Sequence, residues 1–134
     1  MPSALRTSLS VDWPTPKATY DILDAEFHFR DDPCPLGGKG MTDGLAREWV
    51  SPVYVNPPYG RECGKWVQRG YEESQRGKTV VMLLPGRTDT AWFHDYVLQA
   101  SEIRFIRGRL KFGESVGNAP FPSMVVVFRG ISNA

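Results

Sequence analysis

The chain alternates short apolar runs with longer stretches in which apolar residues return every three or four positions. The short runs predict strands, because contiguous or alternating apolar residues fit the faces of a sheet. The run at residues 79–84 lies between Gly77 and Pro85 and is continuous, which is typical of a strand covered on both faces. The predicted strands cover residues 27–30, 53–55, 79–84, 102–106 and 123–128.

The longer stretches predict three helices, each with an apolar stripe on one face. The first begins after Thr15 and Pro16, where Thr15 can cap the helix and Pro16 suits its first position. The second covers residues 62–75 and ends before a glycine, as helices commonly do. The third begins near Thr88 or Asp89, either of which can act as its cap.

Strands alternate with helices in the first part of this order and follow one another directly at its end. The order predicts a three-layer α/β domain, in which a mostly parallel sheet carries an antiparallel hairpin at its edge. A chain of 134 residues can form one modest core, so we expect a single domain over residues 12–130 and a flexible tail over 1–11. The stretch between the first two predicted strands is too short for a full βαβα unit, so the first half should be abbreviated.

The stretch Asn56-Pro57-Pro58-Tyr59 directly follows the apolar run at residues 53–55. Two consecutive prolines end a strand and hold the preceding residues extended, so a stiff turn should follow the strand's carboxyl end. Open α/β sheets bind ligands at that edge. The Asn56 oxygen and the Pro57 carbonyl could accept both hydrogens of an aromatic amine such as adenine N6, and Tyr59 could stack on the ring. The alternative is a tight turn in which Tyr59 only packs.

This four-residue stretch matches the catalytic motif of amino-group methyltransferases that use S-adenosylmethionine. The wider chain resembles the small N6-adenine DNA methyltransferase family of bacteriophages and prophages. The resemblance runs in order from about residue 12 to 128 through segments 13–16, 32–33, 43–49, 56–60, 64–67, 80–85, 87–94, 103–112 and 119–124. It implies a Rossmann-like methyltransferase sheet, transfer of a methyl group to adenine N6 of DNA, and a bacterial or phage-infected cytoplasm.

The resemblance also implies a set of cofactor-binding residues. Thr15 and Pro16 would touch the methionine end of S-adenosylmethionine, and Asp32 would hold its amino group or a ribose hydroxyl. Asp43 would lie near the adenine of the cofactor. With their neighbours, the implied cofactor residues are Thr15, Pro16, Asp32, Pro33, Asp43, Gly44, Leu45 and Asn56. Individually, Thr15 and Asp43 are also explained as ordinary helix caps.

DNA contacts are expected from the end of the third strand and from the Gly-rich loop at residues 108–122. Arg87 could meet a phosphate, and the loop mixes cations with rings, as sites for flipped bases or single strands do. The resemblance places one loop aromatic against the target base, with Phe121 favoured over Phe112; either ring could instead close the core. The expected DNA-binding residues are Tyr59, Arg87, Arg109, Lys111, Phe112 and Phe121.

The sequence departs from standard methyltransferases between residues 36 and 40. Its Leu-Gly-Gly-Lys-Gly loop follows prolines and does not open a convincing helix, so a flexible linker is the simpler interpretation. The cofactor pocket is therefore expected to be abbreviated, completed by unusual residues, or shared across subunits of a homodimer.

The amino-acid composition argues against a metal-binding or membrane-spanning protein, but it does not choose a function. A hydrophobic content of 41% and a charged content of 23% are ordinary for a globular protein, and a net charge of +1 gives no global attraction to nucleic acid. Cys34 and Cys63 lack metal-ligand spacing, so we expect free thiols and no metal. No apolar run approaches the ~20 residues of a membrane span, and residues 1–10 lack a signal core.

Three functions remain open on this evidence. The first is a DNA adenine methyltransferase that uses S-adenosylmethionine. The second is a non-catalytic nucleic-acid-binding relative that has lost cofactor binding. The third is a methyltransferase that acts on RNA or on a protein amide through the same turn.

Overall fold

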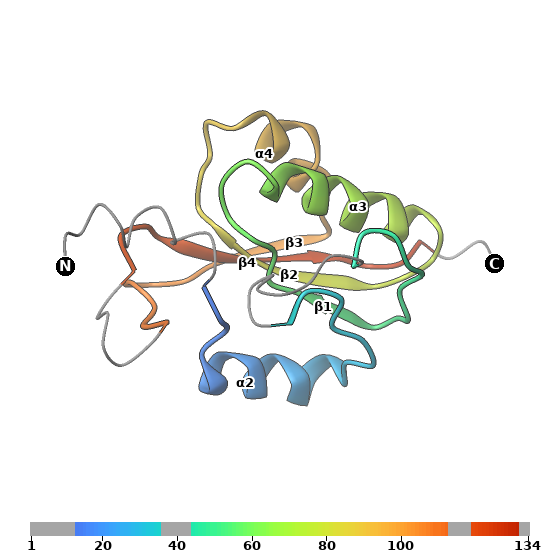
Figure 1. Ribbon diagram of the computed structural model, residues 1–134, viewed down its shortest axis with the longest axis horizontal. Helices are drawn as coiled ribbons and strands as arrows, with labels where there is room; N and C mark the ends of the chain where they lie inside the picture. Colours follow the sequence, from blue (N-terminus) through green and yellow to red (C-terminus); the bar gives the residue numbers. More distant parts are fainter. Residues whose placement is uncertain (1–12, 36–43, 113–118, 132–134) are drawn as a thin grey trace.

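A computed structural model describes residues 13–35, 44–112 and 119–131 of the chain. Its centre is one four-stranded sheet in the order β1-β2-β4-β3 (Figure 1). The strands are β1 (Val53–Val55), β2 (Val80–Pro85), β3 (Glu102–Phe105) and β4 (Ser123–Phe128). These elements match four of the five predicted strands to within about one residue.

Strand directions show that the described sheet is mixed and not mostly parallel as predicted, since one of its three strand pairings is parallel. β1 and β2 are parallel, whereas β4 runs antiparallel to both β2 and β3. The directions of β1, β2 and β3 are therefore the same, and among the described strands β4 runs against them. The antiparallel pair expected at the edge is formed by β3 and β4, with β4 on the inner side.

Helices cover both faces of the sheet, as Figure 1 shows, so the expected three layers are confirmed. Helix α2 (Lys17–Phe27) lies on one face. On the other lie α3 (Cys63–Gln75), the short α4 (Ala91–Asp95) and the 3-10 turn η2 (Val97–Gln99). β2 and β4 between these layers are buried along their whole length, which explains their continuous apolar runs.

The predicted strand at residues 27–30 is wrong. Helix α2 continues through Phe27 and ends where His28 takes a left-handed conformation with φ of 55°. Asp24 holds this end, because its carbonyl accepts from the His28 amide at 2.8 Å and its carboxylate from the Phe29 amide at 2.9 Å. Of the expected strand only a single parallel bridge remains, from Asp31 to Val53.

The third helix begins later than predicted. Its cap is Thr90, whose hydroxyl accepts from the Phe93 amide at 3.2 Å, rather than Thr88 or Asp89. The helix also ends after five residues, and the rest of the expected stripe continues in η2. In the described part of the chain, no helix is long and apolar enough to cross a bilayer.

The topology brings four chain segments together at the edge of the sheet that is formed by the carboxyl ends of β1, β2 and β3. Parallel β1 and β2 both end there, at residues 55 and 85, and β3 ends there at residue 105. β4 runs the other way, so it begins at this edge, with Ser123 beside Pro85. The Asn-Pro-Pro-Tyr turn, Arg87 and the two ends of the Gly-rich loop therefore meet at one place.

Arg69 of α3 fastens the segment at residues 44–50 to the domain. Its guanidinium donates to the carbonyls of Leu45 at 2.6 Å and Arg47 at 2.7 Å, and it lies 4.5 Å from the Trp49 ring centroid. It also donates to Glu73 at 2.7 Å, and the Glu73 side chain is only 2% exposed. Burial would raise the pKa of Glu73, but bonds from Arg69 and Lys78 lower it overall, so this carboxylate stays charged.

Replacing Arg69 with Met should therefore lower the free energy of unfolding by about 2–4 kcal/mol, because it removes a partner of a buried carboxylate. The matched control is Lys17→Met, which removes an ion pair whose Lys17 and Asp21 side chains are 88% and 55% exposed. That change should be below about 0.5 kcal/mol. Urea denaturation measures both, and equal effects of the two substitutions would contradict this account.

Candidate active site

The side chain of Asn56 is fixed at the end of β1. Its amide nitrogen donates to the carbonyl of Trp13 and to the Thr15 hydroxyl, the latter at 3.1 Å. These two acceptors determine which end of the amide carries the nitrogen. The residue is only 2% exposed, and its side-chain oxygen, Oδ1, has no hydrogen-bond partner among the residues that the structure describes.

A buried acceptor without a partner costs on the order of 1–3 kcal/mol, so proteins rarely keep one without a reason. The Asn56 oxygen is therefore an acceptor that the described residues leave unused, although its neighbours close it off from solvent. Pro57, which is buried, and Pro58, which is half-buried, follow it and end the strand. The position of this acceptor is thus set by both the amide contacts and the stiff turn.

Thr15 contacts Asn56 and Tyr54 and does not cap a helix. The N-cap of α2 is Pro16, with no side-chain hydrogen bond, so the predicted capping by Thr15 is wrong. The Thr15 hydroxyl instead lies 2.6 Å from the hydroxyl of Tyr54. Sequence analysis missed Tyr54, although residues two apart in a strand share a face and Tyr54 precedes Asn56 by two.

The Asp32 hollow, a cavity of about 330 Å³, lies beside this cluster. It brings together Thr15 and Asp32, two residues that were predicted to bind the cofactor. Burial raises the pKa of Asp32 to about 6, and the neighbouring carboxylate of Asp31 adds to the shift, while the Cys34 amide opposes it. The lining residues are Pro14, Thr15, Lys17, Tyr20, Asp32, Cys34, Pro35 and Tyr54.

The other expected cofactor residues have structural contacts of their own. A Cβ atom at Gly44 would lie 2.2 Å from the Pro33 carbonyl oxygen, so only glycine allows this close approach. Leu45 is held through its carbonyl by Arg69. Gly44 and Leu45 do not line the Asp32 hollow among the residues the structure describes, and Asp43 lies outside those residues.

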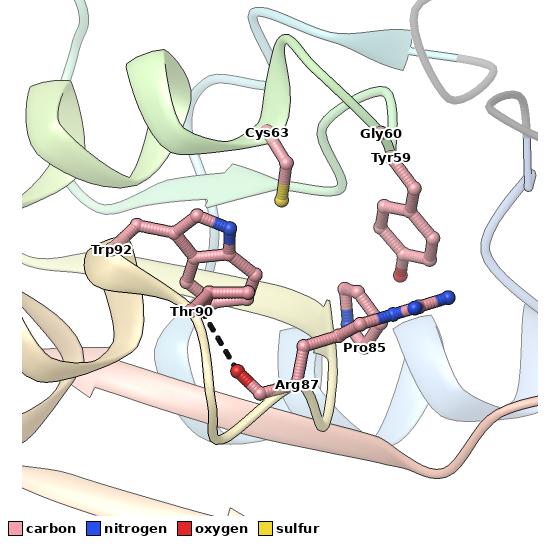
Figure 2. A pocket seen from close by; sticks show the side chains of 7 residues that line it. All are labelled: Tyr59, Gly60, Cys63, Pro85, Arg87, Thr90 and Trp92. Carbon is pink, nitrogen blue, oxygen red and sulfur yellow. Dashed lines mark hydrogen bonds between the residues drawn. The ribbon is translucent and has the colours of Figure 1, made fainter.

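Tyr59 is buried on the other side of the turn. Its hydroxyl donates to the Leu83 carbonyl at 3.1 Å, and burial raises its pKa well above the ordinary value, so it stays neutral. The ring forms a wall of a second cavity, the Tyr59 hollow, of about 260 Å³. Figure 2 shows Tyr59 and Trp92 facing this hollow from opposite sides, with Cys63 and Arg87 between them.

An aromatic cluster covers the turn. Phe121 contacts Tyr59 edge-on, with ring centroids 5.4 Å apart, and Trp13 contacts both Phe121 and Phe112 at 5.3 Å. Phe112 and Phe121 are buried, and their centroids lie 5.9 Å apart. Both rings therefore reach the turn from the loop, and both also belong to the core.

Exposed cations surround this cluster. Arg87 lies 6.0 Å from the centroid of the Phe121 ring, and it borders a third hollow of about 280 Å³ formed with residues 86–89 and 120–122. Arg109 and Lys111 are exposed in the loop that leads to Phe112. Residues 113–118 of the predicted DNA-binding loop lie outside those that the structure describes.

Comparison with known proteins identifies the family of this chain. The family model for DNA N-6-adenine-methyltransferase (Dam) matches residues 3–133, nearly the whole chain. The chain belongs to the Dam family. A DNA N-6-adenine-methyltransferase of Escherichia phage T1 is 33% identical over 93 residues, which are 68% of this chain and 38% of that relative. The chain thus spans less than half of its phage relative, and no solved structure matches it.

In this Dam-family domain, Thr15 and Asp32 line one hollow, and Thr15 also contacts Asn56 of the turn. Tyr59 and Arg87 line another hollow. The sequence did not reveal the contact between Trp13 and Asn56, because Trp13 accepts this hydrogen bond through its backbone carbonyl. No group of three His, Cys, Asp or Glu side chains within residues 13–35, 44–112 and 119–131 could hold a metal ion.

Because the pKa of Asp32 is raised, the difference in stability between wild type and Asp32→Asn should depend on pH. A carboxyl group whose folded pKa is raised stabilises the fold at pH 4 and loses that contribution as the pH rises toward about 6. Asp32→Asn should therefore raise the free energy of unfolding at pH 8 by about 1 kcal/mol, after allowance for solvent screening, and change it little at pH 4. Urea denaturation at both pH values tests this; a difference independent of pH would contradict it.

Proposed function

We propose that this chain transfers a methyl group from S-adenosylmethionine to N6 of adenine in DNA. The observation that carries the proposal is the buried Asn56 oxygen, which has no partner within the described part of the chain. The amide that carries it is held through its nitrogen by the Trp13 carbonyl and the Thr15 hydroxyl. Membership of the Dam family and the phage T1 relative, itself a DNA N-6-adenine-methyltransferase, support the same reaction.

The turn would act by positioning and by electrostatics. N6 of adenine is a poor nucleophile because its lone pair is delocalised into the ring. If its two hydrogens are accepted by the Asn56 oxygen and the Pro57 carbonyl, the nitrogen becomes pyramidal and its lone pair is available. S-adenosylmethionine, when bound, supplies an electrophilic methyl group on a sulfonium. After the displacement, the extra proton on N6 would leave to solvent.

The Asp32 hollow fits the cofactor by its chemistry. Asp32 provides an anion for the amino group of the cofactor, and Thr15 and Tyr54 provide hydroxyl groups next to Asn56. We place the methionine end of the cofactor there, with Thr15 and Pro16 near it, as the resemblance implied. Pro33, Gly44 and Leu45 would support this hollow from the packed segment behind it, and Asp43 stays a prediction.

The DNA-binding side would be the edge that carries Tyr59, Phe112 and Phe121. Phe121 packs edge-on against Tyr59, so a base that stacks on the part of the ring covered by Phe121 requires Phe121 to move. Arg87, Arg109 and Lys111 would meet phosphates around this entrance. A bacterial or phage-infected cytoplasm is the expected location, and a homodimer stays a prediction.

The layers and strand directions support a Rossmann-like methyltransferase fold whose first half is abbreviated. Three described strands share one direction and end at the edge where the site lies, as ligand sites in open α/β sheets do. We also retain the single domain over residues 12–130 as part of the proposal.

The test of the proposed function is the methylation rate of Asn56 variants. Asn56→Ala removes the acceptor and should lower the turnover of DNA methylation by about a hundredfold or more, as loss of a positioned polar group does. Arg30→Gln is the control, because Arg30 is exposed at the opposite edge, beside the start of β1. The assay is transfer of tritium from labelled S-adenosylmethionine to DNA. Equal rates for wild type and Asn56→Ala would overturn the proposed mechanism.

Cofactor affinity should depend on pH through Asp32. Because the pKa of this carboxyl is about 6, it is an anion at pH 8 and becomes neutral below pH 6. Affinity for S-adenosylhomocysteine, whose amino group stays protonated, should fall about tenfold per unit below that pH. Calorimetry should show this slope in wild type, whereas Asp32→Asn should bind weakly at every pH. A slope that survives in Asp32→Asn would remove Asp32 from the cofactor site.

A further inference from the structure

The Tyr59 hollow lies next to the proposed catalytic turn but is separate from the position of the reacting amine. Its lining includes Tyr59 and Gly60 of the turn, and it includes neither Asn56 nor Pro57. The hydroxyl of Tyr59 is bound to the Leu83 carbonyl, so the ring is a fixed wall between the two places. A group in this hollow would be a neighbour of the target adenine, not the adenine itself.

The chemistry of the hollow is that of a nucleotide site. Trp92 offers an aromatic surface, and Arg87 offers a cation for which no carboxylate of the described segments forms an ion pair. Sites for single-stranded nucleic acid combine these two features, because every base can stack and every linkage is anionic. Burial raises the pKa of the Cys63 thiol to about 12, although the charge of Arg87 opposes the shift, so the thiol adds no negative charge.

Local contacts hold both groups in position. A Cβ at Gly64 would lie 3.3 Å from Cδ1 of Trp92, so the pyrrole side of the indole packs against the start of α3. Thr90 holds the turn after β2, because its hydroxyl donates to the Arg87 carbonyl at 2.8 Å (Figure 2). The indole and the guanidinium are thus presented to the hollow from a short, hydrogen-bonded segment.

Arg87 also borders the third hollow, which contains Phe121 and Pro120. The two hollows lie on either side of this cation, and both border rings of the aromatic cluster. A strand that crosses the site can therefore place its phosphate at Arg87 and a base on each side.

We infer that the Tyr59 hollow binds the base of a nucleotide adjacent to the target adenine, stacked on Trp92, with its phosphate at Arg87. This inference rests on the proposed function and adds a residue, Trp92, that would contribute to affinity and to the sequence preference next to the methylated base. The domain would in this way read a neighbouring nucleotide with an element of its catalytic core.

The experiment measures binding of fluorescein-labelled single-stranded oligodeoxynucleotides that carry one adenine within a thymine tract. Trp92→Leu removes the stacking surface and should weaken binding on the order of tenfold, in line with alanine substitutions at stacking positions. Trp92→Phe keeps a ring and should bind within about threefold of wild type. Arg87→Gln should weaken binding and reduce its salt dependence, whereas the control Arg30→Gln should do neither. Circular dichroism melting confirms that each variant is folded.

A second set of oligonucleotides has an abasic site on one side of the adenine or on the other. Removing the base that occupies the hollow should weaken wild-type binding, and with that oligonucleotide Trp92→Leu should have no further effect. The inference is overturned if wild type methylates DNA while Trp92→Leu binds every oligonucleotide as wild type does. If wild type neither methylates nor binds DNA, the proposed function and the inference fail together.

Discussion

The amide of Asn56 connects the parts of this small domain that would have to act together. Its nitrogen is held by the backbone of Trp13 and the hydroxyl of Thr15, residues more than forty positions earlier in the chain. The same contacts fix the direction in which its buried oxygen can accept, and in the described segments that oxygen has no partner. The N-terminal segment, the end of β1 and the proposed amine site are therefore one unit. A change that released Trp13 or Thr15 would also release the acceptor.

Around this unit the sheet separates two environments. On one side, Thr15, Tyr54 and Asp32 form a partly buried polar hollow, where a carboxylate is poorly solvated. On the other, rings and an exposed cation, Arg87, border two further hollows. A small ionic cofactor and an anionic polymer need opposite surroundings, and under the proposed function the two sides of the turn would provide them. The segment that carries Gly44 is packed onto the domain by Arg69, which donates to the carbonyls of Leu45 and Arg47.

Most of the fold could be predicted from local sequence, because continuous apolar runs and proline-terminated strands leave few alternatives. Asn56 could be singled out from its turn as the candidate acceptor, and that role stays a prediction. The strand at residues 27–30 could not be excluded, because an alternating pattern that short also fits the last turn of a helix. The contacts of Trp13 and Thr15 with Asn56 join segments that are far apart in the sequence. Trp13 makes its contact through a backbone carbonyl, which every residue has. Trp92 lies in the apolar stripe of the third helix, and a ring in a pocket wall gives the same sequence pattern there as a ring in the core.

The most direct test of the central claim is the identity of the methylated product. Plasmid DNA from a host without adenine methylation would be incubated with the protein and labelled S-adenosylmethionine, digested to nucleosides and separated by chromatography with mass detection. The account predicts label in N6-methyladenine and in no other nucleoside. Label in a cytosine product, or transfer to RNA or protein with none to DNA, would contradict it.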